Sequence, residues 1–168
     1  MALIRLIYAS RAADALTPAD HEQILESSRR NNAKVGVTGL LAFGAREFLQ
    51  CLEGPRDAVN ATYARILGDR RHADVQILDC RDVDQRWFGE WSMHGLPPSR
   101  LSRQRVLRYS ERELFTPTRM SGASATALLA ELARDGEPAS AEAPTEPAAT
   151  AALEARPTTS GLSGLFRR

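Results

Sequence analysis

Five short segments of the chain are apolar throughout or alternate apolar with polar residues, as β-strands do. They are Leu3–Ser10, Val35–Phe43, Glu47–Glu53, a segment that starts at Val75, and a segment centred on Trp91 to Gly95. Two stretches between them, Pro18 to about Arg30 and Arg56–Leu67, carry apolar residues at helical spacing. The predicted order is therefore strand, helix, strand, strand, helix, strand, strand.

Local signals at the segment ends support this order. Thr17 to Asp20 combines a capping residue, a proline suited to the first helical position and an acid in the first turn. Residues 44–46 turn one strand directly into the next as an antiparallel hairpin. The second helix is predicted to end at a Gly68 cap and to face inward with Val59, Tyr63, Ile66 and Leu67. The order predicts an α+β ferredoxin-like sandwich, βαββαββ, with a five-stranded sheet and both helices on one face.

Beyond Pro97 the pattern changes twice. Leu101–Tyr109 and Ala125–Arg134 are predicted helices, and we expect them to cover the other face of the sheet. Four residues would otherwise be exposed on that face: Leu3, Ile7, Leu49 and Cys51. From residue 136 the composition shifts to Ala, Pro, Glu and Thr without apolar periodicity. We therefore predict a domain over 1–97, a helical extension over 98–135 and a disordered tail over 136–168.

Polar side chains occupy several positions on the predicted core side. Gln50 shares a strand face with Phe48 and Leu52, and a buried amide without partners costs on the order of 1–3 kcal/mol. Tyr8 ends the more apolar face of the first strand, and Ser28, Asn31 and Asn32 continue the inward stripe of the first helix. An asparagine cap of that helix is the alternative explanation for the two amides.

Together these neutral hydrogen-bonding groups predict a groove for a flat heteroaromatic ligand rich in carbonyls and ring nitrogens. Ile24, Phe48 and Leu52 are the candidates to sandwich its ring. Arg65, Asp69 and His72 lie around the end of the second helix, together with Arg70 and Arg71. This cluster either is a solvated helix end or grips an anionic tail of the ligand.

Composition narrows the possible partners and chemistry. Twenty-two basic and twenty-one acidic side chains give a net charge of +1, which favours neither nucleic acid nor an anionic membrane. No segment has the length and apolarity of a membrane span, so we expect a cytoplasmic protein. Cys51 and Cys80 are interpreted as packing residues, and the three histidines lack metal-ligand spacing.

No motif of a common enzyme class is present, since the chain lacks a nucleophile elbow, a phosphate-binding glycine loop and HExxH. A small acylphosphatase-like hydrolase would have to rely on Arg65 or Arg71 with Asn31 or Asn32, outside any glycine-rich anion loop. A flavin-dependent reductase is the other enzymatic alternative, although no nicotinamide site is visible. We therefore expect a protein that is not an enzyme.

Four motifs in order resemble the BLUF family of flavin-binding blue-light sensors, over Leu3 to about Gly95. They are RLIYAS with Tyr8, ESSRRNNAKVGVTGLL with Ser28, Asn31 and Asn32, FLQCLEGP with Gln50, and WSMHG with Trp91 and Met93. The predicted C-terminal helices and the RYS around Tyr109 further resemble the short, stand-alone members, to which no output enzyme is fused.

The resemblance implies FAD as the cofactor, with its isoalloxazine ring between the two helices. Asn31 and Asn32 would hold its polar edge, and Arg65, Asp69 and His72 would contact its ribityl and phosphate parts. Gln50 would bridge Tyr8 and the flavin. Blue light would then drive electron and proton transfer from Tyr8 through Gln50.

The same resemblance implies a route for the signal. A rotated or tautomerised Gln50 amide would strengthen a hydrogen bond to the flavin and shift its absorption slightly to the red. Trp91 and Met93 in the fifth strand would pass this change to the C-terminal helices. The alternative is that Trp91 is simply a core or interface aromatic. An unidentified downstream protein and a homo-oligomer are the implied partners.

Overall fold

The computed structural model describes residues 2–13, 16–44, 46–89, 91–96 and 98–136. The elements of the predicted sandwich are β1 (Leu3–Ala12), α1 (Pro18–Ala33), β2 (Thr38–Phe43), β3 (Glu47–Pro55), α2 (Arg56–Leu67), β4 (His72–Val83) and β5 (His94–Leu96). They are followed by α3 (Arg103–Leu107) and α4 (Gly122–Gly136), with short 3-10 turns at Pro98–Arg100 and Pro117–Arg119. The predicted tail lies outside the described residues from 137 onward.

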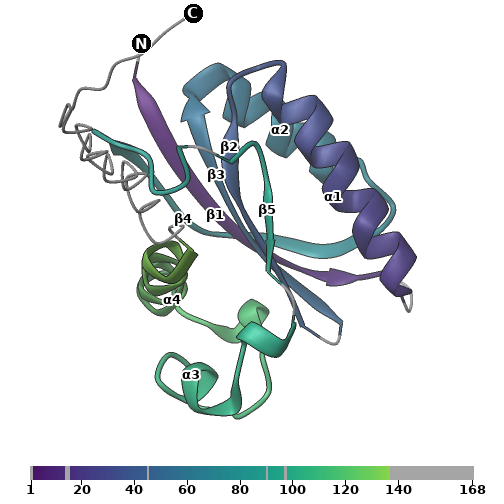
Figure 1. Cartoon of the computed structure of the whole chain (residues 1–168), viewed down its shortest axis with the longest axis vertical. Helices are drawn as coiled ribbons and strands as arrows, with labels where there is room; N and C mark the ends of the chain where they lie inside the picture. The colour runs from purple at the N-terminus through teal and green to yellow at the C-terminus, as the bar shows by residue number, and fades with distance from the viewer. Residues whose placement is uncertain (1, 14–15, 45, 90, 97, 137–168) are drawn as a thin grey trace, which may run out of the picture. The chain divides into compact units, whose positions relative to one another are not determined.

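The five strands form one sheet in the order β4-β1-β3-β2-β5. β1 pairs antiparallel with both β3 and β4, β2 pairs antiparallel with β3, and β5 adds parallel to β2. Figure 1 shows α1 and α2 on one side of this sheet and α4 on the other. The predicted α+β ferredoxin-like fold is confirmed.

Alternation along β1 divides the core into two layers. Ile4, Leu6 and Tyr8 pack on the side of α1 and α2, with Ile24, Leu25 and Val59 from those helices. Ile7 points the other way and packs with Leu49, Cys51 and three leucines of α4, namely Leu128, Leu129 and Leu132. The second sheet face is therefore covered by α4, as predicted. The other predicted C-terminal helix is only Arg103–Leu107, and these described residues are not part of this core.

The start of α1 also follows the predicted signals. The Thr17 hydroxyl accepts from Asp20 N at 3.2 Å, and Asp20 Oδ2 accepts from Thr17 N at 2.7 Å, which makes a capping box. The helix continues past Arg30 to Ala33, and its C-cap is Lys34. Asn31 and Asn32 therefore lie in the last helical turn rather than at the cap.

Three sequence-based expectations were wrong in detail. β2 begins at Thr38 rather than Val35, because Gly36 has a φ of +67° and turns the chain between helix and strand. Leu67 is 54% exposed, since it lies one residue past Ile66, beyond the inward stripe of α2. Cys80 is exposed on the edge strand β4 and does not pack in the core.

The fifth strand is shorter than predicted and starts at His94. Side chains of α1 bind the backbone before it: Asn32 Nδ2 donates to Ser92 O at 3.0 Å and Arg29 Nε donates to Met93 O at 3.1 Å. These carbonyls therefore do not join a strand ladder. Among the described helices, none is both long and apolar enough to cross a bilayer.

Candidate functional site

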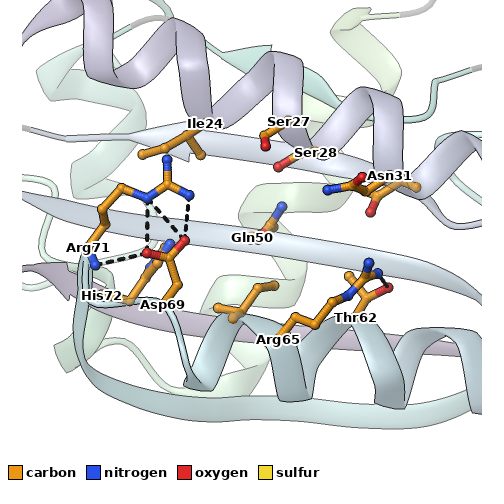
Figure 2. A pocket seen from close by; sticks show the side chains of 12 residues that line it. Ile24, Ser27, Ser28, Asn31, Gln50, Thr62, Arg65, Asp69, Arg71 and His72 are labelled. Atoms are coloured by element: carbon orange, nitrogen blue, oxygen red, sulfur yellow. Dashed lines mark hydrogen bonds and ion pairs between the residues drawn. The ribbon is translucent and has the colours of Figure 1, made fainter.

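A groove lies between α1 and α2, over the middle of β3. Figure 2 shows Ile24, Ser27, Ser28 and Asn31 along α1, Thr62 and Arg65 along α2, and Gln50 between the helices. Asp69, Arg71 and His72 close one end, and Asn32 and Ile66 complete the lining. The groove has a cavity volume of about 110 Å³ and is open to solvent.

The floor of the groove contains a short hydrogen-bonded chain. Tyr8 and Gln50 are direct partners in the antiparallel register of β1 and β3, so their side chains meet on the helix-covered face. The Tyr8 hydroxyl donates to Gln50 Oε1. On the other side of the amide, Gln50 Nε2 donates to Met93 Sδ at 3.3 Å. Gln50 is 3% exposed, so its amide is held between a phenol and a thioether inside the core.

Burial determines the protonation state of Tyr8. Desolvation of its fully buried hydroxyl raises its pKa far above the usual value, and the nearby Tyr63 and Asp69 raise it further. The ring of Tyr63 lies edge-on to that of Tyr8, with centroids 5.6 Å apart. Tyr8 is therefore a neutral phenol that can donate to Gln50 over the whole physiological pH range.

The last two turns of α1 present polar groups to the groove. Ser28 and Asn31 are half-buried lining residues. Asn32 is 2% exposed and uses its Nδ2 group to hold Ser92 O. Its Oδ1 atom remains as an acceptor beside the groove. α1 therefore both lines the groove and anchors the segment that carries Met93.

A charged cluster lies at the end of the groove nearest Ile24. Arg71 Nε donates to both carboxylate oxygens of Asp69, at 2.9 and 3.0 Å, which lowers the pKa of Asp69. His72 Nδ1 lies 2.8 Å from the buried Ser10 hydroxyl. Burial is the main cause that lowers the pKa of His72. Arg65 stands at the opposite end, where its Nη2 donates to Thr62 Oγ1 at 3.0 Å. The groove thus has an arginine at each end.

The structure brings most predicted site residues to this groove but adds others. Tyr8, Phe48 and Leu52 are fully buried below it and are not among its lining residues. Arg71 of the predicted charged cluster lines the groove, as do three residues that the sequence reasoning did not assign to the site: Ser27, Thr62 and Ile66. Helical spacing from Val59 could have found Thr62 and Ile66, because both fall on the inward stripe of α2.

Trp91 and Met93 point to opposite sides of the sheet. Met93 is buried with the groove-side core, whereas the half-buried Trp91 packs against the α4-side core. The Trp91 ring stacks on His94, with centroids 4.4 Å apart. Of the two residues predicted to relay a signal, Met93 contacts Gln50 in this structure.

The described residues also allow a comparison with the enzymatic alternatives, above all with an acylphosphatase-like hydrolase. Within the described ranges, no group of three or more His, Cys, Asp or Glu is arranged to hold a metal ion. Arg71 is engaged by Asp69, and Arg65 lies at the other end of the groove with Asn31. The polar groups thus line a long groove instead of converging on one small anion.

Residues 3–94 match the BLUF family, described as sensors of blue-light using FAD. The chain belongs to this family. Its cofactor is therefore FAD, and its BLUF domain senses blue light. This match covers β1 to β4, both helices α1 and α2, and the groove between them.

Curated relatives of this BLUF protein share the same segment. A photoactivated adenylate cyclase subunit beta of Euglena gracilis is 36% identical over 92 residues, which are 54% of this chain and 11% of that protein. The blue light- and temperature-regulated antirepressor BluF of Escherichia coli is 35% identical over 91 residues, 54% of this chain and 23% of that one. The matched segment is thus a small part of the cyclases and about a quarter of BluF.

Solved structures extend the similarity into the C-terminal helices. The dark-state structure of BlrB, a BLUF protein, has a TM-score of 0.69 and 31% identity, and covers 80% of this chain and 97% of BlrB. The photo-activated state of BlsA has a TM-score of 0.70 and 27% identity, with 78% and 94% of the two chains covered. The BLUF protein described here therefore shares nearly the whole architecture of BlrB and BlsA.

The groove of this BLUF protein fits FAD by the chemistry of its lining. Ile24 and Ile66 come from opposite helices and can contact a flat ring from two sides. Gln50 has two N–H donors, and its only recorded acceptor among the described residues is the weakly accepting Met93 sulfur. A donor is therefore left for a ring carbonyl, and the arginines at the groove ends suit phosphate groups.

Proposed function

We propose that the groove holds FAD with its isoalloxazine ring over Gln50, and that Tyr8, Gln50 and Met93 convert light absorption into a structural change. The observation that carries the proposal is the buried chain from the Tyr8 hydroxyl through the Gln50 amide to Met93 Sδ. Asn31 and Asn32 would hold the polar edge of the ring. Arg65, Asp69 and His72 would contact the ribityl and phosphate parts.

When bound, the photoexcited isoalloxazine ring supplies a strong oxidant next to Gln50. Tyr8 would give up an electron to that oxidant, and its phenolic proton would move along the existing hydrogen bond to Gln50. When electron and proton return, Tyr8 is restored and the Gln50 amide is left rotated or tautomerised. If the amide rotates, an oxygen replaces Nε2 opposite Met93 Sδ, and the hydrogen bond to sulfur is lost.

Met93 would therefore respond first to the change, and the segment before β5 would carry it onward. Small shifts become signals when they bias an element that already has two arrangements. We propose the C-terminal residues on the other sheet face as that element, because Trp91 packs against the core that they share with the sheet. A downstream protein would receive the signal, as the antirepressor name of the Escherichia coli relative suggests. The sensor itself would be a non-enzymatic homo-oligomer in the cytoplasm.

An absorption spectrum tests this proposal directly. The protein is purified in darkness, and its spectrum is recorded before and just after a blue flash and during return to darkness. We expect an oxidised flavin spectrum that shifts slightly to the red and reverts. A flavin spectrum that bleaches with a nicotinamide donor and does not shift would support a reductase. A colourless protein that hydrolyses an acyl phosphate would support the hydrolase.

A further inference from the structure

A buried charged cluster lies on the sheet face opposite the groove. Glu53 of β3 is fully buried, and its Oε1 atom accepts from Arg5 Nε at 2.6 Å. The Arg5 guanidinium also lies 3.3 Å from the centre of the Trp87 ring. Removing two charges from water is costly, so a buried pair of this kind calls for a specific structural explanation.

The remaining acceptor capacity of Glu53 holds the connection between β4 and β5. Trp87 N and Phe88 N donate to Glu53 Oε2 at 2.9 and 3.0 Å. Arg5 Nη2 adds a bond to Gln85 O at 3.3 Å. The Glu53 carboxylate thus fixes two consecutive backbone amides of a segment that has no strand partner at this point.

Arg86 of the same connection holds it from the other side. Its guanidinium donates to Thr38 Oγ1 at 2.8 Å, Glu53 O at 2.9 Å and Gly36 O at 2.8 Å. We call Arg5, Glu53 and Arg86 the β4–β5 clamp. The clamp ties the connection to both central strands, β1 and β3, and to the start of β2.

Only a few residues separate the clamp from Met93. Phe88 O accepts from Trp91 N at 3.1 Å, which closes a tight turn, and Trp91 O accepts from Gly39 N at 3.1 Å. Met93 follows two residues later, with its sulfur on Gln50. Gln50 and Glu53 lie three residues apart on β3 and point to opposite sheet faces. One strand therefore carries both the amide that bonds to Met93 and the carboxylate that holds the connection leading to Met93.

We propose that Glu53 is a positioning residue for the light response, which it influences by fixing the β4–β5 connection so that Met93 Sδ stays against the Gln50 amide. The proposal rests on the function proposed above, in which Gln50 changes its hydrogen bonds. A tightly held Met93 raises the barrier to rearrangement of the amide, so a loosened clamp speeds the return to the dark state.

Glu53→Gln tests the proposal at nearly constant volume. In this variant the side-chain amide keeps one acceptor oxygen for the three N–H donors of Arg5, Trp87 and Phe88. Its NH₂ group cannot accept and is itself a donor that faces them. Glu47→Gln is the matched control, because Glu47 lies on the same strand and face but accepts from Thr118 N and Oγ1, at 3.0 and 2.8 Å. It therefore holds a C-terminal turn instead of the β4–β5 connection.

Two readouts separate positioning from a purely structural role. The chain has three methionines, so ¹³C-methyl methionine NMR in darkness reports Met93 as a single resonance, assigned with Met93→Leu. We expect Glu53→Gln to shift or broaden this resonance and to speed dark recovery by at least about threefold. The control Glu47→Gln should leave both the resonance and the recovery rate unchanged. A Glu53→Gln protein that loses stability but keeps the Met93 resonance and recovery rate would overturn the proposal.

Two further variants complete the test. In a Met93→Leu background, Glu53→Gln should leave the recovery rate unchanged, and an undiminished effect there would show that Glu53 does not act through Met93. If Glu53→Gln does not fold, Arg86→Gln severs the same connection from a half-exposed position and is judged by the same two readouts. A wild-type protein without a red shift would refute the proposed function, while the dark NMR comparison would still decide whether the clamp positions Met93.

Discussion

Tyr8 and Gln50 combine complete burial with a hydrogen bond that has a direction. The phenol is the donor and the amide oxygen the acceptor, and burial keeps the proton on Tyr8. On its other side the amide bonds to sulfur, a weak acceptor. In the mechanism proposed above, rotation of the Gln50 amide would therefore give up only a weak hydrogen bond on the Met93 side.

Tyr8→Phe should retain flavin and lose the red shift, because the ring still fills its site but the electron and proton source is absent. The buried Gln50 oxygen also loses its donor, which should lower the free energy of unfolding by about 1–3 kcal/mol. Flash absorption spectroscopy and urea denaturation measure the two effects. Tyr63→Phe is the control, because its half-buried ring lies 5.6 Å from that of Tyr8 but outside the Gln50 chain. An intact photocycle in Tyr8→Phe would refute the relay.

At the level of elements, close approach between strands positions the segment before β5. Gly39 of β2 faces Leu52 across the sheet, and a Cβ atom there would lie 2.0 Å from Cys51 O. The same position is 3.4 Å from the methyl carbon of Met93. A side chain on Gly39 would therefore push apart the β2–β3 ladder and disturb the sensor methionine.

We expect Gly39→Ala to destabilise the protein by about 1–3 kcal/mol, as overpacking in a core does. Gly89→Ala is the matched control, since a Cβ atom there would meet nothing within 4 Å, and its effect should stay within about 0.5 kcal/mol. Urea denaturation of both variants provides the comparison. Equal stabilities would mean that β2 and β3 can separate locally without cost.

At the level of the whole molecule, two cores share one sheet. The groove-side core contains Tyr8 and Met93, and the other contains Ile7, Leu49 and the inward leucines of α4. The described residues between 2 and 136 belong to one compact unit. The function of 98–135 as a signalling extension remains a proposal, but its residues also complete the second core.

Leu128→Ala should therefore lower the free energy of unfolding by about 2–5 kcal/mol, because Leu128 is fully buried against the sheet. Flavin binding should persist, since the groove lies on the opposite face. Leu114→Ala, at a residue that is 73% exposed, should change stability by no more than about 0.5 kcal/mol. Denaturation followed by flavin absorbance measures both. No loss of stability in Leu128→Ala would indicate that α4 is only loosely attached.

The sequence alone determined the element order, both layers of the sandwich and most of the polar residues at the groove. These follow from local rules: alternation along β1, the capping box at Thr17 and Asp20, and polar residues where a helix or strand calls for apolar ones. The four motifs added the family, which the comparison over residues 3–94 confirmed.

Only the tertiary structure decided the contacts that depend on register and on long-range pairing. Tyr8 meets Gln50 because β1 and β3 pair antiparallel in one particular register, and a shift by one residue would separate them. The short β5 follows from α1 side chains that bind Ser92 O and Met93 O, which no local pattern specifies. Likewise, Arg5 and Glu53 are 48 residues apart in the chain, so their buried pairing exists only once the sheet has assembled.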